Sequence, residues 1–219
     1  MDRQQKERKL KLLREKKRRE EWARWRDNPW LFILECITTI DEADKKEKKF
    51  PDKPYLSYLV DVWLREPLLA IPKSRRMMAT WLFLALHLWA ALFHEHSAIF
   101  VQSKKEQDSA FLVGGKRMEF MYHRLLRDFP NHKWPSMTCK LGPPLMNFSN
   151  GSWVMGIGQG ADQLRQYTAS YVMLDEAAFW ENFRSSFGAL KPIIDGGGRI
   201  VIISSTDAGP FDDLCNGKL

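Results

Sequence analysis

The sequence predicts an α/β fold in which helices flank a mostly parallel β-sheet. The first observation is a series of short, continuous apolar runs, which are typical of strands buried on both faces. The second is that longer helical patterns separate these runs, as crossover connections between parallel strands require. The predicted strands are Leu68–Ile71, Ala98–Gln102, Tyr171–Leu174 and Arg199–Ser204.

A helical extension is predicted at the N-terminus. Asp2–Arg26 is charged, rich in helix formers and free of glycine and proline. Tryptophans supply aromatic anchors toward its end, and Asn28-Pro29 marks a break. We therefore expect a basic helical extension over residues 1–27 and a main domain over residues 28–219.

The remaining elements follow from periodicity and turn signals. Leu145–Ile157 predicts a β-hairpin, because Asn150-Gly151 is typical of a tight turn between two strands. Asp41–Lys49 predicts a charged loop. The predicted helices of the main domain are Leu31–Ile40, Tyr58–Leu64, Thr80–Phe93 and Lys105–Phe129.

The net charge of +7 is concentrated at the N-terminus. The first thirty positions hold twelve Lys/Arg and six Asp/Glu, and the rest of the chain is nearly neutral. Such a segment is a candidate contact for DNA phosphates or for a protein partner, and a solvated charged helix is the simpler alternative. The excess of basic residues therefore lies in the extension and not on a face of the main domain.

Composition argues against secreted and membrane proteins. The three cysteines are far apart and form no C-x-x-C pair, so neither a disulfide framework nor a cysteine metal site is predicted, and a reducing cytoplasm is expected. The charged N-terminus has no apolar run behind it, unlike a secretory signal. The most apolar stretch, Trp81–Phe93, is shorter than the roughly 18 to 20 residues that span a bilayer, so no membrane partner is expected.

The first of three chemical motifs is LLAIPKSRRMMATWLF at positions 68–83. A strand, a polar loop and a helix follow one another, which is the layout of a phosphate-binding loop. Aligned on Thr80, the pattern G-x-x-x-x-G-K-[ST] finds no other match, so a plain strand–loop–helix with solvated cations is the alternative. Phosphate binding itself requires less than this sequence pattern, because Lys73 can reach back over the loop and Thr80 offers a hydroxyl to Mg²⁺. The predicted nucleotide-binding residues are Lys73, Ser74, Arg75, Arg76, Met77, Met78, Ala79 and Thr80.

The second motif is YVMLDEAAFW at positions 171–180. Four apolar residues deliver two carboxylates, Asp175 and Glu176, to the end of a buried strand, where α/β sheets place ligands. We expect Asp175 to hold Mg²⁺ together with Thr80, and Glu176 to polarise the attacking water as general base. The alternative is an acidic helix start with Asp175 as its N-cap.

The third motif is VIISSTDAG at positions 201–209. Its strand ends in the hydroxyl residues Ser204, Ser205 and Thr206, which can sense a γ-phosphate, and a simple strand-to-turn exit is the alternative. The order of the three motifs decides between these alternatives, because each motif follows a predicted buried strand. Together they predict a site for ATP and Mg²⁺.

In these motifs the sequence resembles the large subunit of tailed-bacteriophage terminases, the DNA-packaging motor. The resemblance rests on KSRRMMATW, GADQLRQYTASYVMLDEAAFWE and IISSTDAGP, and it covers most of residues 28–219. It implies a P-loop NTPase fold of the ASCE type and ATP hydrolysis that drives double-stranded viral DNA into the procapsid. The implied partners are that DNA, the portal, the small terminase subunit and further copies in a ring on the portal. The implied location is the host cytoplasm, transiently at the portal vertex, and not the mature virion.

The resemblance also implies roles for single residues. The family has a deviant phosphate loop with its lysine at the start, and Lys73 matches that position. A small-residue strand tip couples hydrolysis to motion in the family, which points to Ser205 and Thr206. An arginine ahead of the acidic strand is proposed to act catalytically on the neighbouring subunit's nucleotide. Arg165 in QLRQY matches it, with an exposed helix arginine as the alternative.

Some features depart from the family or are weakly determined. Met78 stands where many relatives have glycine, so binding is expected to be weak or to need an oligomer. Relatives continue with a nuclease domain of RNase H-like fold, whereas this chain ends at Leu219, so an isolated ATPase domain or a truncated product is expected. Phe50 and Tyr55 are candidates for stacking on adenine, and packing is the favoured alternative.

Two other function classes fit parts of the sequence. A helicase-like, DNA-dependent motor would share the DEAA and SST motifs, although a helicase normally needs a second motor domain. A catalytically weak nucleotide-binding docking module would explain the poor phosphate loop. Loss of ATP hydrolysis in Glu176→Ala with binding retained would exclude the docking module.

Overall fold

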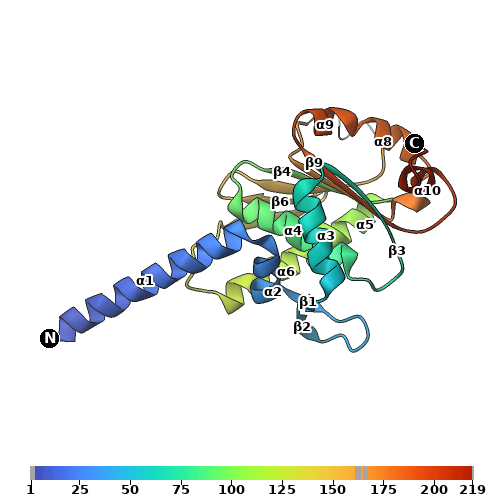
Figure 1. The fold of residues 1–219 in the computed structure, drawn as a ribbon. Coiled ribbons are helices and arrows are strands. Elements are labelled where there is room, and N and C mark those ends of the chain that lie inside the picture. The colour runs from blue at the N-terminus through green and yellow to red at the C-terminus, as the bar shows by residue number, and fades with distance from the viewer. Residues whose placement is uncertain (1–2, 161–163, 165–166, 219) are drawn as a thin grey trace.

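The structure of the chain, a computed structural model, describes residues 3–160, 164 and 167–218. Within these residues a seven-stranded sheet forms the centre, helices cover both of its faces, and one long helix stands away from the body (Figure 1). This architecture confirms the predicted fold class. In chain order the elements are α1 (Arg3–Asp27), α2 (Pro29–Cys36), β1 (Thr38–Ile40), β2 (Glu47–Lys49), α3 (Pro54–Arg65), β3 (Leu68–Lys73), α4 (Ala79–Phe93), β4 (Ala98–Gln102), α5 (Glu106–Val113), α6 (Met118–Asp128), β5 (Met137–Leu141), β6 (Pro144–Phe148), β7 (Trp153–Ile157), β8 (Tyr171–Asp175), the 3₁₀ helix η1 (Ala177–Phe179), α8 (Phe183–Gly188), α9 (Lys191–Asp195), β9 (Arg199–Ser205) and α10 (Pro210–Cys215).

The central sheet has the strand order β3-β9-β8-β4-β7-β6-β5. The first five strands run parallel, and β6 and β5 add an antiparallel edge. At the carboxyl end of β3, Lys73 pairs with Ser205 of β9, and on the next strand Asp175 pairs with Ile203. The ends of β3, β8 and β9 therefore meet at one edge of the sheet, where α/β folds bind their ligands.

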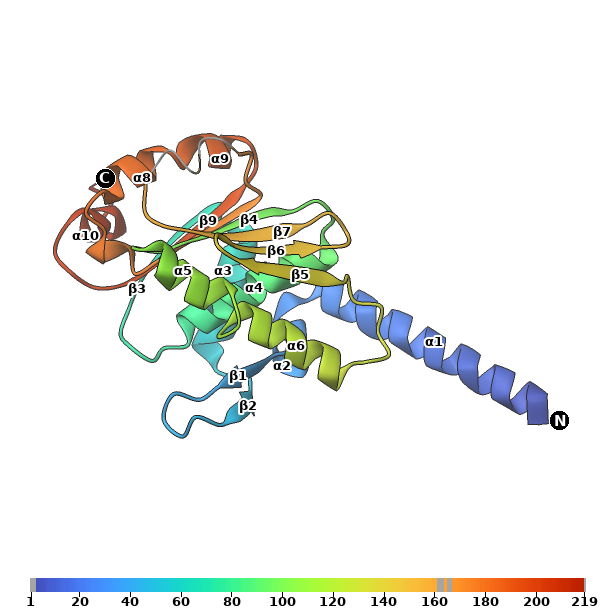
Figure 2. The same ribbon diagram turned by 180° about the vertical axis from the view of Figure 1, so that it is seen from behind.

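Strands β8 and β9 are buried on both faces, as their continuous apolar runs predict. Met173 and Val201 belong to a core that is shared with α2, α3, α4 and α6. Val172 and Ile200, which alternate with them, belong to a second core with α8, α9 and α10. Figure 2 shows these last three helices on the other side of the sheet from α2 and α6.

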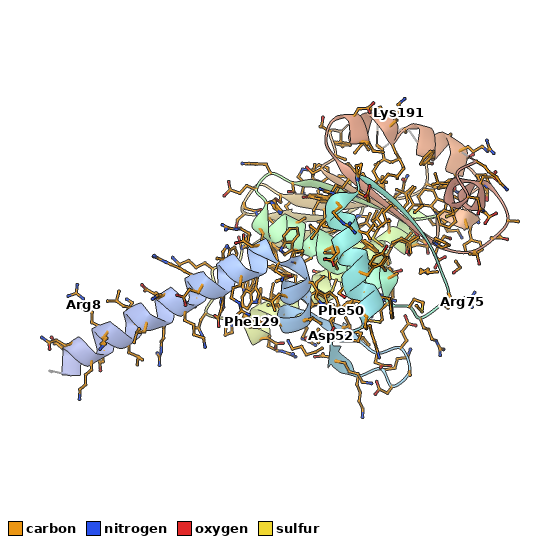
Figure 3. The ribbon with its side chains drawn as sticks, viewed as in Figure 1. Arg8, Phe50, Asp52, Arg75, Phe129 and Lys191 are labelled. Carbon is orange, nitrogen blue, oxygen red and sulfur yellow. The ribbon has the colours of Figure 1, made fainter. Side chains whose placement is uncertain are left out.

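Helix α1 joins the body only through its last turns. Trp25 is 2% exposed, and its carbonyl accepts a hydrogen bond of 2.8 Å from the indole N–H of Trp89 in α4. Trp22 packs against Phe93 at the end of the same helix. The preceding turns are exposed, and Arg8 lies on the part that stands free of the body (Figure 3). The end of the basic helix is therefore part of the main core.

One predicted helix ends early because a small hairpin follows it. The helix predicted over Leu31–Ile40 ends at Cys36, and Thr38–Ile40 forms β1, as its β-branched residues favour. β1 pairs antiparallel with β2 inside the predicted charged loop. This β1–β2 hairpin, residues 38–49, lies beside the site described below.

The long helix predicted over Lys105–Phe129 is two helices. Gly114 and Gly115 lie between α5 and α6, where their backbone freedom favours a break over a continuous helix. The predicted hairpin with Asn150-Gly151 at its tip is present as β6 and β7. Strand β5 pairs with β6 and was not predicted. Among the described residues, none of the helices combines the length and the apolar character needed to cross a membrane.

Candidate nucleotide site

The loop between β3 and α4 borders a cavity of about 970 Å³ at the carboxyl edge of the sheet. Lys73 ends β3, Thr80 is the second residue of α4, and Arg75 lies on the loop at the margin of the body (Figure 3). Of the eight predicted residues at 73–80, all within the described chain, seven line this cavity and Ser74 is the exception. The volume is in the range of a small-molecule site.

The loop turns through two residues with left-handed backbone. Arg76 has φ of 63° and Met78 has φ of 57°, although neither is glycine. Met78 is the N-cap of α4 and makes no side-chain cap hydrogen bond. The first N–H groups of this 15-residue helix, which carry the positive end of its dipole, are thus left without a partner from the cap side chain. A phosphate group is a suitable partner for them.

Lys73 and Glu176 form an ion pair across the sheet edge. The ammonium nitrogen lies 2.9 Å from Oε1, and the lysine side chain is only 10% exposed. Oε2 accepts the Ser205 N–H at 3.1 Å. Burial by itself raises the pKa of Glu176, but the hydrogen bonds from Lys73 and from Ser205 outweigh it and hold the pKa below its usual value. Glu176 is therefore ionised at neutral pH, which is the form that a general base requires.

Asp175 and Thr80 form the second pair of the site. Oγ1 of Thr80 donates to Oδ1 of Asp175 at 3.0 Å. Burial raises the pKa of Asp175 to about 6, and the Thr80 hydrogen bond opposes that rise. A carboxylate and a hydroxyl beside a phosphate loop are the oxygen donors that Mg²⁺ takes together with phosphates and water. In the described part of the chain no cluster of three or more His, Cys, Asp or Glu could hold a metal ion.

The tip of β9 reaches the acidic pair through Ser204. Its buried hydroxyl lies 3.4 Å from Oε2 of Glu176 and accepts the N–H of Ala178 at 3.0 Å. Ser205 contributes its backbone N–H to the same carboxylate. Thr206 follows the strand and is exposed. The strand tip with its run of hydroxyl residues therefore contacts Glu176. Ser205 and Thr206 are the predicted site residues, and the contact made by Ser204 was not predicted.

Several residues of the cavity wall lie outside the three motifs. Arg117 comes from the turn before α6, Glu42 from the β1–β2 hairpin, and Phe111 from α5. The Phe111 ring is about half exposed, at 49%. No sequence signal marks these three residues, because only the tertiary fold brings their segments to the sheet edge.

The two candidates for adenine stacking lie in different surroundings. Phe50 is 4% exposed and packs edge-on against Trp30, which is the arrangement of a core aromatic. Tyr55 is 39% exposed, and its hydroxyl donates to the Met77 carbonyl of the loop at 3.4 Å. Arg165, the predicted residue for a neighbouring subunit's nucleotide, lies outside the described residues.

The strand–loop–helix, the acidic strand and the strand between them define a P-loop NTPase fold. Residues 71–214 match the family model described as "Terminase large subunit, T4likevirus-type, N-terminal". The match covers more than half of the chain, and the chain belongs to this family. No curated protein sequence matches the chain.

Solved structures of phage terminases share the fold at low sequence identity. The large terminase ATPase domain of Thermus phage P74-26 aligns with a TM-score of 0.54 at 16% identity, covering 74% of this chain and 68% of that one. The HK97 bacteriophage large terminase aligns with a TM-score of 0.59 at 12% identity, over 85% of this chain and 38% of that one. A large terminase from a thermophilic bacteriophage, solved in complex with ADP, gives 0.52 at 12% identity, over 77% and 44%. The chain thus spans less than half the length of the last two proteins.

Proposed function

We propose that the chain is the ATPase domain of a terminase large subunit, which hydrolyses ATP with Mg²⁺ to drive double-stranded viral DNA into a procapsid. The observation that carries this proposal is the convergence of Lys73, Asp175 and Glu176 on one cavity at the carboxyl edge of the sheet. Family membership favours a packaging motor over other P-loop enzymes. The large terminase that was solved with ADP was also solved with ATP-gamma-S, which supports nucleotide as the ligand here.

Each member of the cluster has a chemical part in the proposal. Lys73 leaves Glu176 for the nucleotide's phosphates, and the Ser205 N–H continues to favour the ionised carboxylate. Glu176 then orients a water molecule and takes its proton as the water attacks the terminal phosphorus and the bond from that phosphorus to the ADP oxygen breaks. Mg²⁺ held by Asp175 and Thr80 would supply positive charge to the phosphate oxygens.

The tip of β9 is the proposed link between hydrolysis and movement. Ser204 and the Ser205 N–H hold Glu176 from the neighbouring strand, so a shift of the carboxylate changes contacts of β9 directly. Thr206 continues this tip toward solvent. Arg165 is proposed to act on the nucleotide of the next subunit when copies assemble in a ring on the portal, where such an arginine accelerates phosphoryl transfer by roughly 10³ to 10⁵.

Helix α1 is the proposed contact for the duplex. Positions 3–19 hold ten Lys/Arg and two Asp/Glu, and the first turns of this stretch stand free of the body (Figure 1). At the base of this helix, a second cavity of about 420 Å³ is lined by Arg18, Arg19, Arg26 and Lys133. A duplex phosphate backbone complements such a surface, and the small terminase subunit is the competing partner.

Salt dependence tests the proposed binding of DNA by α1. Replacing Lys6, Arg8, Lys9 and Lys11 by glutamine should weaken duplex binding, and the slope of log affinity against log salt should fall by about 0.9 for each phosphate that the variant no longer neutralises. The control replaces four exposed lysines elsewhere, Lys116, Lys140, Lys191 and Lys218. An equal weakening in both quadruple variants would contradict a specific role of α1.

Glu176→Gln tests the enzymatic proposal. The variant should bind ATP-gamma-S within about threefold of the wild type, whereas its turnover should fall at least about 100-fold, as expected when a general base is removed. The matched control is Glu181→Gln, because Glu181 lies five positions on and its side chain is 78% exposed. ATP binding without hydrolysis by the wild type, alone and with DNA, would support the docking module instead. DNA strand separation without packaging would support the helicase-like motor.

A further inference from the structure

Arg117 is a cation in the wall of the cavity, and the mechanism proposed above gives it no role. Its side chain is only 17% exposed. The guanidinium carbon lies 4.3 Å from the centroid of the Trp81 ring and 5.5 Å from that of Phe111. Trp81 directly follows Thr80 of the phosphate loop, so stacking holds the cation beside that loop.

The guanidinium group of Arg117 pairs with a carboxylate that a phosphate group could replace. Nη2 lies 3.3 Å from Oε1 of Glu42 in the β1–β2 hairpin, and the Glu42 side chain is 50% exposed. Both residues line the cavity that contains Lys73 and Asp175. The Glu42 contact is a single one to a half-exposed carboxylate, and such pairs are weak, whereas a phosphate carries more negative charge and can accept two parallel hydrogen bonds from the guanidinium.

Arg117 also lies within electrostatic reach of the predicted Mg²⁺ site. Arg117, Thr80 and Asp175 line the same cavity, and Arg117 stacks on Trp81, the residue that follows Thr80. A buried cation at this position favours negative charge in the cavity. A triphosphate that enters here adds negative charge beside Asp175 and Glu176, so it needs cations in addition to Lys73.

We propose that Arg117 is a phosphate-binding residue of the nucleotide site in its own subunit, exchanging Glu42 for the phosphates of the bound nucleotide. The proposal rests on the proposed function, since it concerns the same cavity. It adds a contact that comes from the turn between α5 and α6, and it makes Glu42 a competitor of the nucleotide. Nucleotide binding would thereby release the β1–β2 hairpin from this turn.

Arg124 provides a matched control on the next turns of α6. Its guanidinium carbon lies 4.9 Å from the centroid of the Phe120 ring, and its Nε donates to Glu47 of the β1–β2 hairpin at 2.8 Å. Arg124 therefore has the same stacking and the same tie to the hairpin. Among the described residues that line the cavity, however, Arg117 is present and Arg124 is not.

The experiment measures the dissociation constant of ATP-gamma-S with Mg²⁺ by calorimetry on the whole chain. Arg117→Ala should raise it by about tenfold or more, as expected when a charge-assisted hydrogen bond is removed. Arg124→Ala should stay within about twofold, and Arg117→Lys should fall between. Glu42→Gln should bind as tightly as the wild type or more tightly, because the competing carboxylate is gone. Melting curves of the two alanine variants check that both fold.

The outcomes separate this inference from the proposed function. Arg117→Ala binding within about twofold of the wild type, or Arg124→Ala losing as much affinity as Arg117→Ala, would overturn the role of Arg117 and leave the ATPase proposal standing. If Arg117→Ala does not fold, weaker binding by Glu42→Gln would overturn it. A wild-type chain that binds no ATP-gamma-S would overturn the proposed function itself.

Discussion

The ammonium nitrogen of Lys73 lies 2.9 Å from Oε1 of Glu176, although 103 residues separate them in the chain. Lys73 ends β3 and Glu176 directly follows β8, and only β9 separates these two strands in the sheet. Glu176 itself has left-handed backbone, with φ of 52° and ψ of 42°. Such a conformation costs a non-glycine residue about 1 kcal/mol or more, and it persists where the surroundings hold it, here Lys73 and the tip of β9. A lysine at the end of β3 can thus reach the acidic pair without a lysine inside the loop.

Asp175→Asn is expected to stabilise the fold while abolishing hydrolysis. Burial raises the pKa of Asp175 to about 6, so the folded chain binds its proton more tightly than the unfolded chain does. The stability linked to this carboxyl is fully present below the unfolded pKa and is lost as the pH rises through about 6. At pH 7 the neutral amide should therefore add roughly 1 to 3 kcal/mol to the free energy of unfolding.

Urea denaturation at two pH values measures this effect. The gain from Asp175→Asn should be largest near pH 7 and small near pH 4, where the folded wild type already holds the proton. A variant that is no more stable than the wild type at pH 7 would contradict the burial of an ionised Asp175.

Met78→Gly is expected to be more stable than Met78→Ala by about 1 kcal/mol. Both variants lack the methionine side chain, but only glycine adopts the φ of 57° without a steric penalty. Urea midpoints of the two variants isolate the backbone effect from the loss of packing. An alanine variant as stable as the glycine variant would mean that the loop does not hold this residue in the left-handed region.

Trp25→Ala is expected to lower the free energy of unfolding by roughly 3 to 5 kcal/mol. Trp25 is 2% exposed and lies in the core with α2 and α4, although it belongs to the basic helix. Leu12→Ala, in the same helix at a side chain that is 58% exposed, should change stability by less than about 0.5 kcal/mol. Chemical denaturation compares the two, and a change below about 1 kcal/mol in Trp25→Ala would show that the end of α1 does not belong to the core.

Four strands of the central sheet, the edge strand β3 and the inner strands β4, β8 and β9, could be predicted because continuous apolar runs mark them. Each of the four continuous apolar runs forms a strand, and Arg199–Ser204 lies within β9. Elements with weak signals could not be predicted in this way. The exposed Glu47–Lys49 strand has no apolar face, and its partner Thr38–Ile40 continues an apolar helix pattern. Tertiary pairing decides such segments, not local preference.

The contacts among the motif residues follow from the parallel direction of their strands, which the sequence pattern implies. Parallel strands end at one edge, so Lys73 and Glu176 could be expected to approach each other. Arg117 could not be found in this way. Its position depends on the break between α5 and α6 at Gly114, which the pattern of a single long helix conceals. Trp25 differs from Arg117, because the sequence predicts tryptophans as aromatic anchors at the end of the basic helix, and the Trp25 ring does lie in the core.

The most direct test of the account is the nucleotide affinity of Lys73→Met, measured by calorimetry with ATP-gamma-S and Mg²⁺. Lys48→Met is the control, because Lys48 lines the same cavity but pairs with Asp41 in the hairpin. The double variant Lys73→Met/Glu176→Gln distinguishes two effects of losing Lys73. One is the loss of a phosphate-binding cation, and the other is the repulsion between the phosphates and an unpaired Glu176. Lys73→Met and this double variant should both bind about 100-fold more weakly, as expected for a charge-assisted interaction, while Lys48→Met stays within about threefold. Wild-type affinity in Lys73→Met would contradict the account.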